Sequence, residues 1–92
     1  MIKVSVIILT QNEEDNIKHT LSSVSQYFDQ IIVVDSFSKD STVDIIKSFD
    51  KVQLYQNHFD SWADQRNWII SNADIKNEYI FFVDADELVT SE

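Results

Sequence analysis

Four short apolar runs, separated by segments with helical spacing, place the strongest limit on what this chain can fold into. The runs are rich in β-branched residues, which is typical of strands buried on both faces, and they cover Val4–Leu9, Ile31–Val34, Val52–Tyr55 and Tyr79–Val83. Apolar residues at intervals of three and four predict a helix in each gap between these runs. The predicted order is therefore β-α-β-α-β-α-β, which requires parallel strands joined by right-handed crossovers.

The predicted helices are defined by the apolar residues that share one face. These are Ile17, Leu21, Val24 and Phe28 in the first helix, Val43, Ile46 and Phe49 in the second, and Trp62, Ile69 and Ala73 in the third. The acidic residues at positions 13–15 are expected in the first turn of the first helix, where the helix dipole favours negative charge. Helices on both faces of a parallel sheet make a three-layer α/β sandwich, for which we predict the strand order 3-2-1-4.

Composition excludes several classes of site and partner. The 92 residues contain no glycine, which excludes the glycine-rich phosphate loops of Walker and Rossmann sites. They also contain no cysteine, which excludes thiolate zinc sites and cysteine nucleophiles. A net charge of −9 repels phosphate backbones, so we expect no nucleic-acid partner and a preference for divalent cations. The apolar runs are far shorter than the roughly 18 residues of a membrane span, so we expect a cytoplasmic protein, at most associated with the inner face of a membrane.

Polar residues follow three of the four predicted strands, at the edge where parallel α/β sheets bind their ligands. These candidate site residues are Thr10, Asn12 and Glu13 after the first strand, Asp35 after the second, and Asp84 and Asp86 after the fourth. The pair Asp84 and Asp86 offers two carboxylates one residue apart, which are the hard oxygen ligands that Mg²⁺ or Mn²⁺ prefers. We therefore predict a divalent metal site at Asp84 and Asp86.

Each candidate also has a purely structural interpretation. The two aspartates could form a solvated acidic turn, and Asp35 could cap the serine-rich turn that follows it. Asn12 and Glu13 could mark only a helix start. Arg66 could be a surface residue whose stem lies along apolar neighbours, or a cation that reaches a phosphate or a base carbonyl. We interpret both tryptophans, Trp62 and Trp68, as packing residues of the core or its rim.

Together these segments resemble the amino-terminal half of family-2 glycosyltransferases, which have the GT-A fold. The resemblance lies in the opening strand with its Asn-Glu turn, in IIVVDSFSKDST, in WADQRNWIISNA with its Arg-Asn pair, and in FFVDADE. The four motifs occur in the family's order and span essentially all 92 residues. The pattern is most similar to bacterial members that build lipopolysaccharide core or other cell-surface glycans.

The resemblance implies a hexosyl transfer, with inversion, from a nucleotide-sugar donor to a glycan or lipid-linked acceptor. A UDP-sugar is the expected donor, with Mg²⁺ or Mn²⁺ as the cofactor. By resemblance, the nucleotide-sugar-binding residues are Thr10, Asn12, Glu13, Asp35, Arg66 and Asp84, and the metal ligands are Asp86 and Asp84. Thr10, Glu13 and Asp35 would contact the base and ribose. Arg66 would lie near the base or diphosphate, Asp84 would lie near the ribose or donor sugar, and Asp86 would hold the metal.

The chain departs from the family pattern at Phe37, which stands where glycine is usual. If that position needs a positive φ, phenylalanine is costly there and the turn is strained. The family's acceptor site and general base normally follow the matched segment, so we expect residues 1–92 to be a truncated, donor-binding half. We also expect the sheet edge beside the fourth strand to be exposed and to favour self-association.

Three other functions fit parts of the sequence. A nucleotide-binding or partner-binding half-domain without turnover would share every feature described so far. A haloacid-dehalogenase-like phosphatase would use Asp84 and Asp86 after an apolar strand, with Val89 or Thr90 following. A response-regulator-like receiver would need an acidic pair after the first strand and a phospho-acceptor aspartate after the third, where the chain has Gln56 and Asn57.

Overall fold

Seven elements alternate along the chain in the predicted order, and the computed structural model describes residues 2–85. The elements are β1 (Ile2–Thr10), α1 (Ile17–Ser25), β2 (Phe28–Asp35), α2 (Thr42–Lys47), β3 (Val52–Gln56), α3 (Trp62–Asn72) and β4 (Ile80–Asp84). The four strands form one sheet in the order β3-β2-β1-β4, and all three strand pairs are parallel. The predicted strand order is confirmed.

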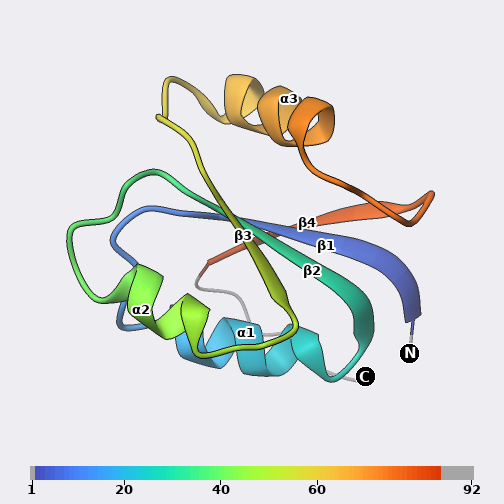
Figure 1. The fold of residues 1–92 in the computed structure, drawn as a ribbon, viewed down its shortest axis with the longest axis horizontal. Helices are drawn as coiled ribbons and strands as arrows, with labels where there is room; N and C mark the ends of the chain where they lie inside the picture. The colour runs from blue at the N-terminus through green and yellow to red at the C-terminus, as the bar shows by residue number, and fades with distance from the viewer. Residues whose placement is uncertain (1, 86–92) are drawn as a thin grey trace.

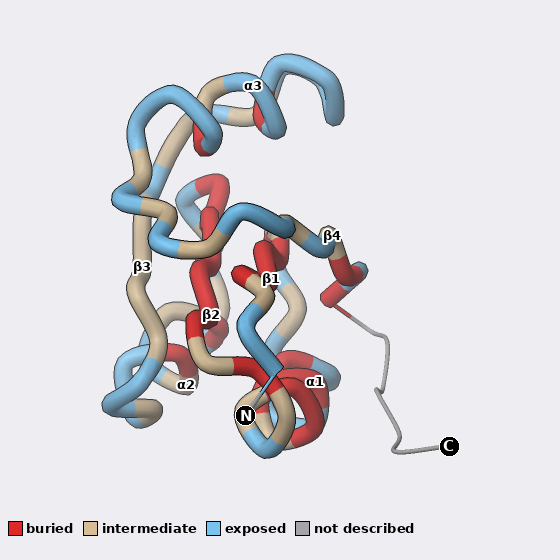
Figure 2. The backbone as a smooth tube through the Cα atoms, turned by 90° about the vertical axis from the view of Figure 1, so that its right-hand side faces the viewer, coloured by how far each residue is buried: buried red, intermediate tan, exposed pale blue. Residues whose placement is uncertain are grey.

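The sheet is the middle layer of three. Figure 1 shows α1 and α2 on one face of the sheet and α3 on the other. Because side chains alternate along a strand, Val6 and Ile8 of β1 enter the core beneath α1, whereas Ile7 enters a second core beneath α3. The central strands β1 and β2 are thus buried on both faces, and α3 is mostly exposed, as Figure 2 shows.

Two of the predicted helix boundaries are wrong. Helix α1 begins at Ile17, with no acidic residue in its first turn. The backbone N–H groups of Glu13 and Glu14 instead donate to side chains of the neighbouring loop. Phe28 opens β2 instead of closing α1, since the N–H of Ile2 donates to the carbonyl of Tyr27 at 2.7 Å and Phe28 pairs with Ile2. Phe28 nevertheless joins the core beneath α1.

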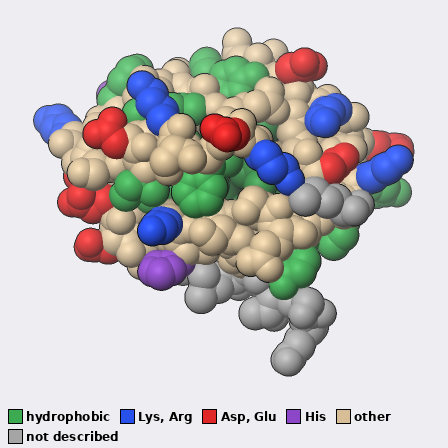
Figure 3. All heavy atoms as spheres, turned by 60° about the horizontal axis from the view of Figure 1, so that its bottom comes forward, with side chains coloured by type: hydrophobic (Ala, Val, Ile, Leu, Met, Phe, Trp, Pro, Cys, Tyr) green, Lys and Arg blue, Asp and Glu red, His purple; other side chains and the backbone are tan. Residues whose placement is uncertain are grey.

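The sheet ends in two edge strands, β3 and β4. On β4, Phe81 is 50% exposed although its ring stacks on Phe28 at a centroid distance of 6.3 Å. Strand β4 thus ends the sheet, as predicted, and self-association through this edge stays a prediction. Figure 3 turns the side of Figure 1 that carries α1 and α2 toward the viewer, and there acidic and basic side chains are interspersed with hydrophobic ones. Between residues 2 and 85, no helix is long and apolar enough to cross a membrane.

Candidate functional site

The turn after β2 is organised by Asp35, whose side chain is 0% exposed. Its Oδ1 accepts hydrogen bonds from the hydroxyls of Thr10, at 2.8 Å, and Ser38, and its Oδ2 accepts from the backbone N–H of Ser38 at 2.8 Å. The amide of Gln56 also donates to Oδ2, at 3.4 Å. Asp35 thus caps the serine-rich turn, as its structural interpretation predicted, and joins that turn to the end of β1.

The loops after β1 and β2 are joined by reciprocal bonds between side chains and backbone. Asn12 donates its N–H to Ser38 Oγ at 2.8 Å, and its Oδ1 accepts from the N–H of Lys39 at 2.9 Å. The N–H of Glu13 donates to Thr42 Oγ1 at 2.8 Å. A chain without glycine therefore fixes these turns with short polar side chains, which compete for backbone groups in just this way.

Asp40 belongs to the same pair of loops. The Thr42 hydroxyl donates to the Asp40 carboxylate and lowers the pKa of that carboxyl. Burial opposes this shift, whereas the backbone N–H groups of Thr42 and Glu14 add to it by donating to the carboxylate at 2.9 Å and 3.2 Å. Asp40 consequently stabilises the two loops more strongly when its carboxyl group is ionised.

Two residues in these loops have a left-handed backbone: Asn12, with φ 54°, and Phe37, with φ 53°. Asparagine tolerates this region, but phenylalanine does not adopt it without strain. The Phe37 ring is 56% exposed, so burial compensates little of that strain. Position 37 therefore has the positive φ under which the sequence analysis expected a strained turn.

A cleft of about 390 Å³ opens at the carboxyl edge of the sheet, between α3 and the end of β4. The residues that line it are Leu9, Glu13, Trp62, Arg66, Phe82, Val83, Asp84 and Ala85. Three predicted site residues, Glu13, Arg66 and Asp84, thus meet in one cleft. The Arg66 guanidinium lies over the Phe82 ring, 5.4 Å from its centroid, and this cation–π contact holds the cation at the cleft wall.

A smaller hollow of about 70 Å³ adjoins the cleft and shares Leu9 and Trp62 with it. Its other lining residues are Thr10, Gln11, Ser36 and Phe59. Trp62 is 57% exposed and meets the Phe59 ring edge-on at 4.9 Å. Trp68, in contrast, packs against Tyr55 in the second core, as predicted. Trp62 therefore lines both cavities.

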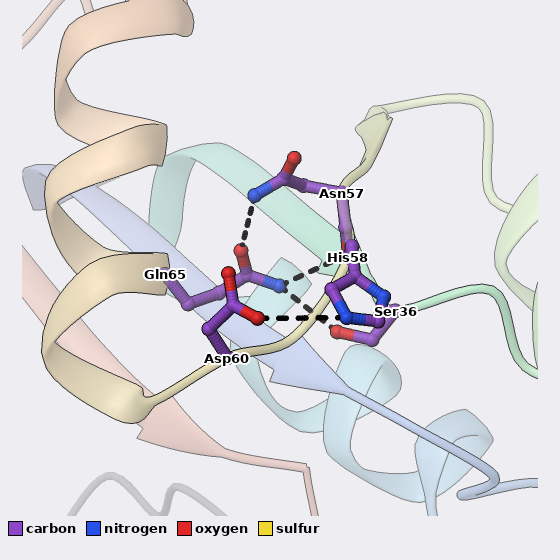
Figure 4. A network of polar contacts seen from close by, with 5 residues as sticks. All are labelled: Ser36, Asn57, His58, Asp60 and Gln65. Carbon is purple, nitrogen blue, oxygen red and sulfur yellow. Dashed lines mark hydrogen bonds and ion pairs between the residues drawn. The ribbon is translucent and has the colours of Figure 1, made fainter.

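Sequence reasoning missed Gln65, a fully polar side chain that is only 1% exposed. Figure 4 shows its side chain extending from α3 toward Ser36 and Asn57. Its Nε2 donates to Ser36 Oγ at 2.9 Å and to the Asn57 carbonyl at 3.3 Å. Its Oε1 accepts from Asn57 Nδ2 at 2.8 Å. The one available signal was its position four residues before Ile69, the other buried residue of α3.

Of the two predicted metal ligands, one lies among the described residues. Asp84 lies in the cleft, and Asp86 lies outside the described residues. Across positions 2–85, no three His, Cys, Asp or Glu side chains gather as a ready-made metal site. The chemistry of the cleft still fits Mg²⁺ or Mn²⁺, because Asp84 supplies a hard carboxylate oxygen in a cavity with room for ligand oxygens.

Comparison with known proteins places these features in a family. A family model described as Glycosyl transferase family 2 matches residues 5–92. The chain belongs to this family. The match excludes the phosphatase and receiver interpretations of the aspartate-bearing strands and confirms the resemblance of the four motifs.

Two similar proteins and a third that shares the fold show how much of known proteins this family-2 glycosyltransferase chain covers. Glycosyltransferase SunS of Bacillus subtilis (strain 168) is 44% identical over 87 residues, which cover 92% of this chain and 20% of SunS. The structure of S. aureus TarS 1-349 in complex with UDP has a TM-score of 0.80 at 27% identity, covering 99% of this chain and 29% of that one.

Glucosyl-3-phosphoglycerate synthase from Mycobacterium tuberculosis, solved with Mn²⁺, UDP and glucosyl-3-phosphoglycerate, has a TM-score of 0.71 at 22% identity. It shares the fold over 90% of this chain and 33% of its own length. The family-2 chain thus spans a third or less of each of these relatives.

Proposed function

We propose that residues 1–92 are the donor-binding half of an inverting hexosyltransferase that takes its sugar from a UDP-sugar. The observation that carries this proposal is the cleft at the carboxyl edge of the sheet, where Glu13, Arg66 and Asp84 meet beside an aromatic wall. Its volume, about 390 Å³, lies within the range of small-molecule sites. The acceptor class that we propose is a glycan or lipid-linked glycan of the bacterial cell surface.

The base and ribose of the donor are assigned to the smaller hollow and its junction with the cleft. Trp62 offers an exposed aromatic face there, and Thr10 and Ser36 offer hydroxyl groups. Asp35 and Asn12 support the residues around this hollow. Asp35 accepts a hydrogen bond from Thr10, and Asn12 joins the loop after β1 to the loop after β2. Their contribution to donor binding is the shape of the turn.

The diphosphate is assigned to the larger cleft. Arg66 is the cation that lines it, and a guanidinium binds phosphate oxygens through two parallel N–H groups. Asp84 and Asp86 would hold Mg²⁺ or Mn²⁺, which when bound neutralises charge on the departing diphosphate. Glu13 lines the same cleft and orients the sugar or ribose hydroxyls by accepting their hydrogen bonds.

Transfer with inversion also needs a carboxylate that removes the proton from the acceptor hydroxyl as its oxygen attacks the anomeric carbon. Glu13 and Asp35 belong to the nucleotide end, so neither is assigned this role. An enzyme that lacks its general base typically transfers the group about 10²–10⁴-fold more slowly. We therefore expect the 92-residue chain to bind donor and to transfer sugar poorly or not at all.

The test is calorimetric titration of UDP, GDP and dTDP into the 92-residue chain with Mn²⁺ present. UDP should release heat in a Mn²⁺-dependent manner, and Asp86→Ala should abolish that dependence. The matched control is Glu87→Ala, which removes the same charge one residue away and should change UDP affinity little. Absence of UDP binding by the wild-type chain, or equal losses in both variants, would overturn the proposed donor site.

A further inference from the structure

The amide of Gln65 can be oriented from the chemistry of its partners. The carbonyl oxygen of Asn57 can only accept a hydrogen bond, so the Gln65 atom 3.3 Å from it must be the NH₂ nitrogen. The same nitrogen lies 2.9 Å from Ser36 Oγ and has no lone pair to offer. Ser36 Oγ is therefore the acceptor in its contact with Gln65.

The direction of this hydrogen bond determines whether the Ser36 hydroxyl can donate to a ligand. Its oxygen accepts from Gln65, so its own proton remains available for a different partner. No hydrogen bond among residues 2–85 uses that proton. Ser36 lines the small hollow, and its backbone N–H donates to the Thr10 carbonyl at 2.9 Å, which fixes it beside the end of β1.

Thr10, the other hydroxyl of the hollow, has the opposite polarity. It gives its proton to Asp35 Oδ1 at 2.8 Å, so its oxygen can only accept from a ligand. The hollow thus presents one hydroxyl that donates and one that accepts, next to the face of Trp62. This pattern complements the edge of a base on which a carbonyl oxygen stands next to an N–H, as in uracil.

We propose that Ser36 donates a hydrogen bond to a carbonyl oxygen of the nucleobase, and that Gln65 is the positioning residue that directs this donation. The inference rests on the proposed donor site and adds its base-recognising group. Gln65 touches no ligand. It acts by donating to one lone pair of Ser36 Oγ, which fixes the hydroxyl group, and by holding α3, which carries Trp62 and Arg66, against the ends of β2 and β3.

The decisive variants are Ser36→Ala and Gln65→Glu. The first removes the donor, and the second places a carboxylate that accepts the Ser36 proton and withdraws it from the hollow. Each should weaken UDP binding about three- to tenfold, as expected for one neutral hydrogen bond. The double variant should bind no more weakly than Ser36→Ala alone, because both changes remove the same bond.

The control is Gln26→Glu, which adds the same charge at the far end of α1 and should leave UDP affinity unchanged. A second readout uses 2-thio-UDP and 4-thio-UDP, in which one carbonyl oxygen is replaced by sulfur, a weaker acceptor. Wild type should discriminate against one of them, and Ser36→Ala should not. A purely structural Gln65 would lower the melting temperature without altering this discrimination.

The outcomes separate the two levels of the proposal. If the wild-type chain binds UDP and Ser36→Ala binds it equally well, with unchanged thio-nucleotide discrimination, the role of Ser36 and Gln65 is overturned. If the wild-type chain does not bind UDP, the donor site itself is wrong. Since Ser36→Ala removes only one hydroxyl, it decides the matter even if Gln65→Glu fails to fold.

Discussion

The left-handed backbone at Phe37 allows a sharply defined test of how this chain turns without glycine. We compare two variants that both remove the half-exposed ring, Phe37→Gly and Phe37→Ala, so that the loss of ring contacts cancels between them. They differ in the Cβ atom, which is what makes a φ of 53° costly for any residue other than glycine.

The expected difference follows from two opposing terms. A left-handed backbone costs a residue with a Cβ atom about 1–2 kcal/mol. Glycine, however, gains about 0.4–1 kcal/mol more conformational entropy in the unfolded chain, which favours unfolding. The strain term is larger, so Phe37→Gly should be about 1 kcal/mol more stable than Phe37→Ala. For a domain of this size that corresponds to about 4–8 °C in melting temperature.

The assay is urea and thermal unfolding of both variants at one pH, followed by circular dichroism. An equal slope of free energy against urea would show that both variants expose the same surface on unfolding. If Phe37→Ala is as stable as Phe37→Gly, or more stable, then position 37 is not strained and the reasoning about this turn is wrong.

Further predictions concern ionisation, the sheet edge and the cleft. The lowered pKa of Asp40 means that its stabilisation is complete above the unfolded value of 3.8 and is lost as the pH falls through the lower folded value. Urea midpoints of Asp40→Asn should therefore vary less over that acidic range than those of wild type. Phe81→Lys should reduce any concentration-dependent association measured by light scattering, because a lysine on an edge strand opposes strand pairing; association that is unchanged would exclude this edge. Arg66→Gln should weaken UDP binding in calorimetry more than Arg66→Lys does, and equal binding by all three proteins would remove Arg66 from the diphosphate site.

The fold could be predicted because its signals are local. Runs such as Ile31–Val34 are apolar at every position, which is typical of a short strand covered on both faces. Element boundaries could not be predicted as well, since Phe28 continues the helical spacing of α1 but is drawn into β2 by pairing with Ile2. Hydrogen bonds between β1 and the start of β2 determine that boundary, and the spacing of apolar residues does not reveal such bonds.

The site was predictable where topology alone brings residues together. Glu13 follows β1 and Asp84 ends the neighbouring parallel strand β4, so their meeting at one edge results from the strand order. The smaller hollow and Gln65 were not predictable, because they depend on α3 meeting the ends of β2 and β3. From the sequence alone, a buried glutamine such as Gln65 cannot be distinguished from an exposed polar residue on the same helix.

The central claim is that the carboxyl edge of the sheet binds a nucleoside diphosphate. The measurement that tests it most directly is the change in amide and indole NMR shifts of the 92-residue chain on addition of UDP and Mg²⁺. The account predicts that the largest changes fall on Thr10, Ser36, Trp62, Arg66 and Asp84, the residues around the hollow and the cleft. Changes centred on Gln30 and Lys76, at the opposite end of the sheet, or no changes at all, would contradict it.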